Sequence, residues 1–272
     1  MILLFDIGNT HTHIGLADGQ RVRKQTDIPT LTWFGGGAAA LVKKFAGAAK
    51  IDGAVLCSVV PRATPLVRKF VAQIGTPVTA GVQASACSAD TLKRELQRTG
   101  VPLLELTPKT LRGVGIDYPK PGSIGPDRLA NAVAAKFRFG APVVVVDFGT
   151  AVTFDVVNAK GNYVGGIIAP GLAAMTDYLH EKTALLPKIK IREVKSVVGK
   201  STEHAMLVGA VHGYRGLIRG LLVELKRELK TKKLPVVATG GCAKLIAAKL
   251  PEISAVAPDL TLEGLRLVWS AK

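Results

Sequence analysis

A run of valines that ends in an acidic turn constrains this chain more than any other stretch. Val143–Val157 reads VVVVDFGTAVTFDVV. Consecutive β-branched residues before Asp147 are typical of a strand buried on both faces. After Gly149 and Thr150 the composition returns to that of a strand, so the segment predicts a β-hairpin. A Walker-type phosphate loop would instead lead into a helix and carry Gly-Lys-Ser or Gly-Lys-Thr at the turn, and this turn does not.

The N-terminus repeats this arrangement. Met1–Thr12 reads MILLFDIGNTHT. When Asp6 is aligned with Asp147, each copy is a hydrophobic run followed by Asp, any residue, Gly and polar residues, and Thr12 falls on Thr153. A single Asp-x-Gly after a strand is often an ordinary turn. Two copies in one chain predict duplicated half-domains that face each other across a cleft.

Both turns have a composition suited to phosphate. Backbone amides in a glycine-containing turn, together with hydroxyl and amide side chains, can surround phosphate oxygens. A carboxylate repels phosphate, so Asp6 and Asp147 imply either a bound cation or a proton-transfer role. The pair therefore favours phosphoryl transfer, in which catalysis is mostly positioning and charge neutralisation. Two ordinary β-turns are the alternative interpretation.

Further motifs extend from one end of the chain to the other. Besides Tyr118 they are Asp6–Thr12, Ser58–Pro61, Gly125–Arg128, Asp147–Asp155, Gly165–Gly171, Thr183–Pro187, Gly199–Thr202, Ala238–Gly241 and Leu260–Leu265. Through these motifs, in this order, the chain resembles the type III pantothenate kinases of the acetate kinase, sugar kinase, Hsp70 and actin superfamily. The resemblance implies an α/β fold of two ribonuclease-H-like lobes, with mixed β-sheets flanked by helices and a cleft between them. We expect the lobes at 1–125 and 126–272.

The resemblance also implies an activity. It is the ATP-dependent phosphorylation of pantothenate to 4′-phosphopantothenate, the first step of coenzyme A biosynthesis, with Mg²⁺ and a monovalent cation, K⁺ or NH₄⁺. One alternative is a non-catalytic relative that acts as a regulatory or binding protein, although Asp6, Asp127 and Asp147 are all present. Another is a related small-molecule kinase with a different substrate.

The motif Gly125–Arg128 carries the implied catalytic residue. By resemblance, Asp127 is the general base for the substrate hydroxyl and Arg128 binds the substrate, with Gly125, Pro126, Tyr118 and Thr183 as further substrate contacts. From its position alone, Asp127 has a simpler explanation, because acidic residues are favoured in the first turn of a helix. Pro126 stands where Ala is more usual and removes a backbone donor.

The two acidic turns receive the remaining implied roles. The first would bind ATP phosphates through Asp6, Ile7, Gly8, Asn9, Thr10, His11, Thr12 and His13, and the second through Thr150. Asp147 would hold the monovalent cation. His11 and His13 alternate along the chain, as metal ligands can, but with no third ligand nearby hydrogen-bonded or solvated imidazoles are favoured.

Composition narrows the class of protein. The formal net charge is +16, which raises the question of nucleic-acid binding. The basic residues are dispersed, apart from clusters at Lys188–Arg192 and Lys226–Lys233, so acidic substrates are the simpler explanation. No apolar run approaches the roughly 18 residues of a membrane span. Scattered cysteines and the lack of a signal-like N-terminus predict a cytoplasmic protein.

Periodicity predicts the other elements. Strands are expected at Met1–Phe5, His13–Leu16, Gly53–Val60, Tyr163–Ile168 and Leu234–Thr239. Helices are expected at Ala38–Ala49, Thr64–Gln73, Arg128–Arg138, Met175–Glu181, Lys200–Lys230 with a break near Gly213–Gly216, Ala243–Lys249 and Pro258–Val268, and at Ser88–Gly100 within an insertion at about 75–110. Small residues every four positions, Ala205, Gly209 and Gly213, fit either internal helix packing or the contact of a homodimer.

Overall fold

The computed structural model describes residues 1–74, 100–231 and 233–271. The helix expected over Ser88–Gly100 and most of the expected insertion fall outside these residues. The chain forms two compact units. The first comprises Met1–Leu111, Gly125–Ala130 and Thr261–Lys272, and the second comprises Arg112–Ile124 and Asn131–Leu260. Where the sequence led us to expect a single boundary after residue 125, the C-terminal residues group with the N-terminal ones.

The first unit is built on a five-stranded sheet. Its strands are β1 (Ile2–Ile7), β2 (His11–Ala17), β3 (Val22–Pro29), β4 (Gly53–Ser58) and β5 (Leu103–Glu105), in the order β3-β2-β1-β4-β5. The β1, β2 and β3 strands pair antiparallel, while β4 and β5 continue the sheet parallel to β1. Sequence analysis did not predict β3, because its exposed, polar residues lie at a sheet edge and lack the alternation of a half-buried strand.

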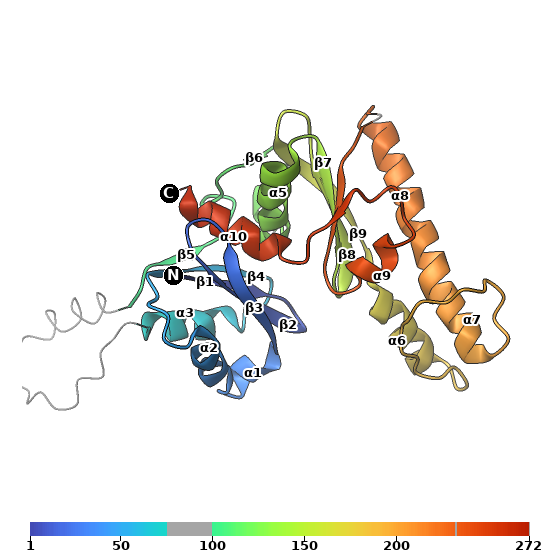
Figure 1. Ribbon diagram of the computed structural model, residues 1–272, viewed down its shortest axis with the longest axis horizontal. Coiled ribbons are helices and arrows are strands. Elements are labelled where there is room, and N and C mark those ends of the chain that lie inside the picture. The colour runs from blue at the N-terminus through green and yellow to red at the C-terminus, as the bar shows by residue number, and fades with distance from the viewer. Residues whose placement is uncertain (75–99, 232, 272) are drawn as a thin grey trace, which may run out of the picture. The chain divides into compact units, whose positions relative to one another are not determined.

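Helices cover both faces of this sheet (Figure 1). On one face lie α1 (Leu31–Phe34), α2 (Ala38–Ala46) and α3 (Thr64–Ala72). Phe5, Trp33 and Phe70 meet edge to face in the core beneath them, with ring centroids 5.9 to 6.3 Å apart. On the other face lies α10 (Leu260–Ser270), whose Trp269 occupies the space a side chain at Gly53 would need. The C-terminal helix thus completes the core of the N-terminal unit.

The second unit repeats the topology of the first. Its strands are β6 (Gly115–Ile116), β7 (Val143–Phe148), β8 (Ala151–Val157), β9 (Asn162–Pro170), β10 (Val236–Thr239) and β11 (Ala255–Val256). The order β9-β8-β7-β10-β11 corresponds to β3-β2-β1-β4-β5, with the same antiparallel and parallel pairs, and β6 is added at the β9 edge. The valines before Asp147 are all fully buried. These sheets confirm the duplicated, mixed α/β fold.

The helices of the second unit follow the expected pattern with one correction. They are α6 (Leu172–Lys182), α7 (Thr202–Val208), α8 (Tyr214–Glu228) and α9 (Ala243–Ala247), with most of α5 (Pro126–Phe139) and a 3₁₀ turn at Pro121–Ser123. The break expected near Gly213–Gly216 is wrong, because a π-helical stretch at Gly209–Gly213 joins α7 to α8 directly. No helix in the described part of the chain is long and apolar enough to cross a membrane.

Candidate active site

The first acidic turn lies at the carboxyl edge of the first sheet. Since β1, β4 and β5 are parallel, their carboxyl ends share one edge, which is where ligands bind in open α/β sheets. The turn itself is closed by a hydrogen bond from the Gly8 amide to the His11 carbonyl, 3.0 Å. Asn9, Thr10 and His11 are exposed. The predicted phosphate-binding turn therefore presents its polar residues to solvent.

Thr12 supports this turn from within the core. It is fully buried, and its hydroxyl lies 3.1 Å from that of Thr30 and accepts a hydrogen bond from the Trp33 indole at 3.2 Å. Thr30, also buried, donates to the Gly8 carbonyl at 2.7 Å. The Thr12 hydroxyl is thus engaged inside the protein, and its contribution to a phosphate site would be to hold the turn.

Strand register corrects the alignment of the two hairpins. Asp6 pairs with His13 across β1 and β2, whereas Asp147 pairs with Thr153 across β7 and β8. Thr153 therefore corresponds to His13, and the sequence alignment that placed Thr12 on Thr153 is wrong. The first turn is one residue longer than the second, and an alignment without a gap cannot represent this.

His13 is hydrogen-bonded, as the sequence favoured. Its Nδ1 lies 2.7 Å from the Asp27 carboxylate on β3. Within residues 1–74, 100–231 and 233–271, no three His, Cys, Asp or Glu side chains are grouped to hold a metal ion. His11 and His13 thus do not form part of a preformed metal cluster in the described chain.

Asp127 lies at the N-terminus of α5. Pro126 is the first residue of this helix, where the missing N–H has no intrahelical partner to lose. The Asp127 carboxylate accepts a hydrogen bond from the Arg128 amide at 2.9 Å. It lies so close to Gly125 that a Cβ there would be 2.4 Å from its Oδ1. Gly125 and Pro126 therefore shape the backbone that carries Asp127.

Asp6 and Asp127 share a neighbour in the first unit, the fully buried Cys57 of β4. The Cys57 thiol donates a hydrogen bond to Asp6 Oδ1 at 3.2 Å. Burial, and after it the charges of Asp6 and Asp127, hold the pKa of this thiol well above its usual value. Burial also raises the pKa of Asp127, against the opposing effect of the Arg128 amide and guanidinium. Two of the three predicted acids thus act on one thiol.

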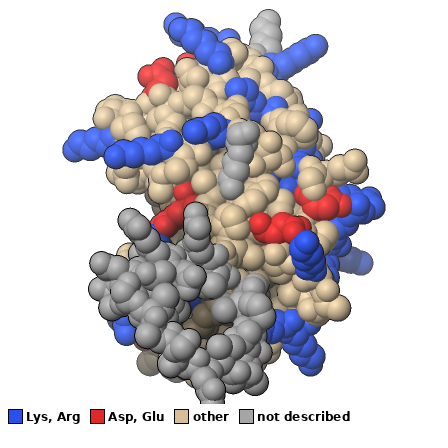
Figure 2. Space-filling model, turned by 90° about the vertical axis from the view of Figure 1, so that its left-hand side faces the viewer, with Lys and Arg blue, Asp and Glu red and all other residues tan. Residues whose placement is uncertain are grey.

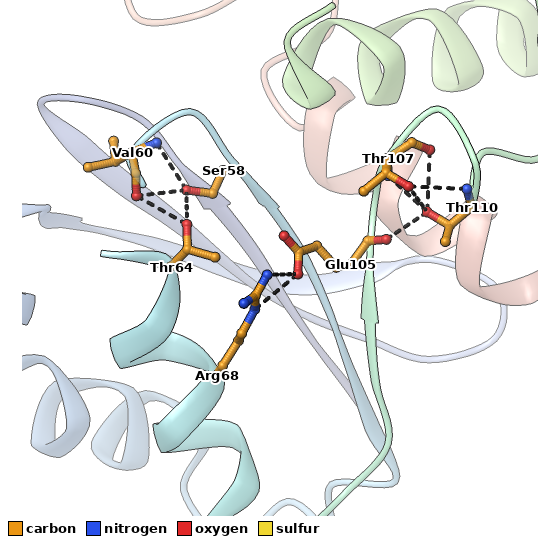
Figure 3. Close-up of polar contacts among 7 residues, drawn as sticks. All are labelled: Ser58, Val60, Thr64, Arg68, Glu105, Thr107 and Thr110. Carbon is orange, nitrogen blue, oxygen red and sulfur yellow. Dashed lines mark hydrogen bonds and ion pairs between the residues drawn. The ribbon is translucent and has the colours of Figure 1, made fainter. Parts of the chain in front are cut away.

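Hydroxyl groups fix the loops after β4 and β5 (Figure 3). The Ser58 hydroxyl accepts from Thr64 at 2.8 Å and from the Val60 amide at 3.1 Å. After β5, Thr110 donates to the Glu105 carbonyl at 2.6 Å and accepts from the Thr107 amide at 2.8 Å. The loops that follow both strands at the carboxyl edge are thereby held in defined conformations.

The second acidic turn has a corresponding environment in the second unit. Asp147 accepts a hydrogen bond from the buried Asn131 amide at 3.0 Å. Glycines enclose the turn, since a Cβ on Gly171 would lie 2.2 Å from the Thr150 carbonyl and one on Gly240 would lie 2.6 Å from Asp147 Oδ1. The N-terminus of α6 and the loop after β10 thus approach the turn too closely for any side chain.

The other predicted substrate residues also lie in the second unit. Tyr118 is partly exposed and packs against Tyr163, with ring centroids 6.2 Å apart. Thr183 follows α6, where its hydroxyl donates to the Leu179 carbonyl at 2.8 Å and accepts from the Leu186 amide at 3.2 Å. Asp6, Asp127 and Arg128 therefore belong to one unit, and Asp147, Thr150, Tyr118 and Thr183 to the other.

Sequence analysis missed the residues that support the acids. Cys57, Thr30 and Asn131 carried no motif signal of their own. Cys57 stands one position before the Ser58–Pro61 motif and Asn131 stands one helical turn after Asp127. That spacing places Asn131 on the same helix face as Asp127, which was the one available indication.

Comparison with known families identifies the family of this chain. The family model described as type III pantothenate kinase matches residues 2–101 and 84–224. A type III pantothenate kinase of Akkermansia muciniphila is 43% identical over 266 residues, 97% of this chain and 96% of that protein. The chain belongs to the type III pantothenate kinase family. A second member, from Methylacidiphilum infernorum, is 40% identical over 98% of this chain and 87% of its own length.

Solved structures agree with the fold of this family member. A candidate Baf family transcriptional activator from Campylobacter jejuni superposes with a TM-score of 0.54 at 18% identity, over 98% of this chain and 96% of that one. A candidate 2-dehydro-3-deoxygalactonokinase from Sinorhizobium meliloti gives 0.55 at 12% identity, over 98% of each chain. At such identities the likeness concerns the fold alone.

Basic and acidic side chains are interspersed on one face of this family member. Figure 2 shows Lys and Arg side chains distributed across the face in view, with acidic side chains between them. Several of the basic groups are paired with acids, such as Arg68 with Glu105 and Arg192 with Glu203.

Proposed function

We propose that this chain catalyses the ATP-dependent phosphorylation of pantothenate to 4′-phosphopantothenate, the first step of coenzyme A biosynthesis, with Asp127 as the general base. Membership of the type III pantothenate kinase family supports the reaction. The observation that carries the assignment of the base is the position of the Asp127 carboxylate, partly buried at the start of α5, where its charge and that of Asp6 both raise the pKa of the Cys57 thiol.

The chemistry suits a buried carboxylate. A primary alcohol is a weak nucleophile until a base accepts its hydrogen bond, and a raised pKa brings a carboxylate closer to the operating pH. As the pantothenate oxygen attacks the γ-phosphorus, the bond to the β-γ bridging oxygen breaks and ADP leaves. Asp127 accepts the hydroxyl proton, so the products are the phosphate ester, ADP and one proton, which the carboxyl group later releases.

Arg128 follows the base directly and would bind the pantothenate carboxylate. A guanidinium matches a carboxylate with two parallel hydrogen bonds, which fixes the substrate as well as neutralising it. Tyr118 and Thr183 would contact the rest of the substrate. Gly125 and Pro126 would contribute by shaping the backbone that carries Asp127. Pro126 has no N–H to donate, and at the first position of α5 the helix needs none.

The two acidic turns would hold ATP. Amides and side chains of Ile7–His11 would surround phosphate oxygens, and Thr150 would also contact phosphate. Mg²⁺ in kinases is commonly held by one or two carboxylates together with the nucleotide phosphates. The Asp6 carboxylate beside the exposed turn fits that donor set, and Mg²⁺ would supply charge neutralisation on the phosphates there. His13, which lies on β2 and is hydrogen-bonded to Asp27, would contribute to phosphate binding from that strand.

Asp147 is our proposed ligand for a monovalent cation, K⁺ or NH₄⁺. Its carboxylate is held by Asn131, and the backbone of Gly240 comes close to the same carboxylate. Oxygen-rich sites with a single carboxylate suit a weakly charged ion. The cation would neutralise charge near the second turn without taking part in bond changes.

The helix running from α7 into α8 supports a homodimer. Ala205, Gly209, Gly213, Gly216 and Gly220 are exposed along it, and a Cβ at any of these glycines would meet nothing within 4 Å. Glycine destabilises a helix by about 1 kcal/mol relative to alanine. Gly199 approaches Ala205, but the space beside the four glycines is open in the described chain, so we propose that the glycines contact a second copy. The unpaired Cys57 and Cys242 are consistent with our placement of the enzyme in the cytoplasm.

A coupled assay for ADP formation tests this function. The purified chain is given MgATP with or without pantothenate, in K⁺ or in Na⁺. We expect turnover only with pantothenate, and faster turnover in K⁺. Turnover that ignores pantothenate but responds to another acceptor would support a different small-molecule kinase, and the absence of any turnover despite ATP binding would support a regulatory relative.

A further inference from the structure

We propose that Cys57 is a positioning residue that orients the Asp6 carboxylate toward the nucleotide phosphates. This inference rests on the proposed function of the first acidic turn and adds a residue to it. The motifs that identify the family place Asp6 but say nothing of what holds its side chain. The structure supplies that partner from the neighbouring strand.

Strand pairing brings the two residues together. β1 and β4 run parallel, and in their register Asp6 lies directly opposite Cys57. Opposed residues in a sheet point to the same face, and the Cys57 sulfur lies 3.2 Å from Asp6 Oδ1. Cys57 is fully buried on β4, the strand that lies between β1 and β5. Its backbone is held in register with that of Asp6 by the pairing of β4 with β1.

Chemistry sets the direction of this hydrogen bond. An ionised carboxylate has only acceptor oxygens, so the thiol must donate. The Cys57 side chain is fully buried. The same burial excludes a role as an accessible nucleophile. A thiol also suits this position because it is small and apolar enough for a packed sheet while still offering one donor.

The consequence concerns the orientation of Asp6. Residues that hydrogen-bond a ligand carboxylate fix its rotamer, and their loss typically lowers affinity for the bound group. Removing one hydrogen bond to a charged acceptor, from a weak donor, should weaken MgATP binding by about fivefold to tenfold. The pantothenate KM should change less than the dissociation constant of MgATP, since the Cys57 thiol donates its hydrogen bond to Asp6.

The test compares three substitutions at one position. Cys57→Ala and Cys57→Val remove the donor, the first leaving space and the second filling it, while Cys57→Ser keeps a donor. The dissociation constant of ATP is measured by calorimetry as Mg²⁺ is varied. We expect weaker MgATP binding in the Ala and Val variants and near wild-type binding in the Ser variant. Equal binding in all three, or a loss shared by the Ser variant, would overturn the proposal.

A matched control distinguishes a loss of packing from a loss of the hydrogen bond to Asp6. Val55→Ala removes a buried side chain from the same strand and face, two residues away. We expect it to lower the melting temperature without changing the Mg²⁺ dependence of ATP binding. If Val55→Ala changed that dependence as much as Cys57→Ala does, the effect would be general packing and the positioning role would be refuted.

A double-mutant cycle with Asp6→Asn tests whether Cys57 acts through Asp6. If it does, Cys57→Ala should weaken MgATP binding in the wild-type background and change it little in the Asp6→Asn background. Additive losses would contradict the proposal. Failure of the proposed function is distinguishable, because it would appear as absent pantothenate-dependent turnover in the wild type, whereas failure of this inference leaves that turnover intact.

Discussion

Two opposing effects act on the pKa of the Asp127 carboxyl group. Burial raises its pKa from the ordinary value of 3.8, while the Arg128 amide and the Arg128 charge lower it, and burial prevails. A carboxylate whose pKa is raised is a better proton acceptor than a solvated aspartate. The helix N-terminus thus holds the carboxylate in place without removing its basicity.

The pH dependence of catalysis should report this carboxyl group. The base works only when ionised, so kcat/KM for pantothenate should fall as the pH drops through the raised pKa, and the acid limb should lie above 3.8. Rates are measured by ADP formation, with circular dichroism at each pH to exclude unfolding. A rate that stays constant down to the range of an ordinary aspartate would contradict the assignment.

The same group should make folding less favourable at neutral pH. Its pKa is raised in the folded state, so the cost of burying the charge is present above the ordinary pKa and is relieved as the pH falls through the folded value. Asp127→Asn should therefore melt at the same or a higher temperature than the wild type at pH 7, and any gain should shrink in acid. A gain that grows as the pH falls would refute this account.

The supporting residues were not predictable from the sequence in the way the acids were. An Asp-x-Gly turn between apolar runs can be recognised in the sequence, because strand composition and turn chemistry depend on residues that are close together in the chain. Cys57 and Asn131 acquire their partners only through the parallel pairing of β1 with β4 and the packing of α5, which are long-range. Thr12 illustrates the converse, since its motif position suggested phosphate while register buries it.

At the scale of elements, the second turn depends on the close approach of α6. Gly171 precedes this helix with an ordinary φ of −67°, so its need for glycine comes from space rather than from backbone angle. A methyl group would meet the carbonyls of Thr150 and Gly149 at 2.2 and 2.6 Å. The turn and the helix could then no longer keep their present separation.

Gly171→Ala should accordingly weaken ATP binding by tenfold or more, since backbone atoms would have to shift by more than a few tenths of an ångström. Calorimetric titration with ATP gives the measurement. Gly35→Ala is the control, because Gly35 has a φ of −84° and open space around its Cβ position. Equal ATP affinity of the two variants would show that the turn does not depend on this approach.

Elements differed from expectation where local composition and tertiary packing disagreed. β3 is polar because only its pairing with β2 is needed at a sheet edge. The glycines near 213 suggested a break, yet Ala210, Val211, Tyr214 and Ile218 are buried along the same helix. Burial of these side chains compensates for the low helix propensity of glycine. Boundaries elsewhere agreed within a few residues because apolar periodicity was strong.

At the scale of the whole molecule, two sheets of one topology account for the paired acidic turns. Each sheet places its Asp-x-Gly turn after the central strand of its own unit. Supporting residues are not duplicated, since Cys57 serves one acid and Asn131 the other. The sheet topology is repeated in both units, but the residues that support the two acids differ. For this reason the sequence predicted the fold more completely than the site.

The exposed glycine face predicts the oligomeric state. Light scattering after gel filtration should give the mass of a dimer for the wild type. Gly213→Arg should give a monomer, because the long charged side chain prevents close helix contact while arginine is a better helix former than glycine. Gly35→Arg, on another exposed glycine, should remain a dimer. A monomeric wild type, or a dimeric Gly213→Arg variant, would contradict the proposed contact.

The measurement that bears most directly on the central claim is pantothenate-dependent ADP formation by Asp127→Asn, compared with the wild type at equal occupancy by ATP. The account predicts a folded variant that binds ATP normally and turns over more slowly by ~10²–10⁴. A variant with wild-type turnover, or one whose loss is explained by weaker ATP binding alone, would contradict the assignment of Asp127 as the base.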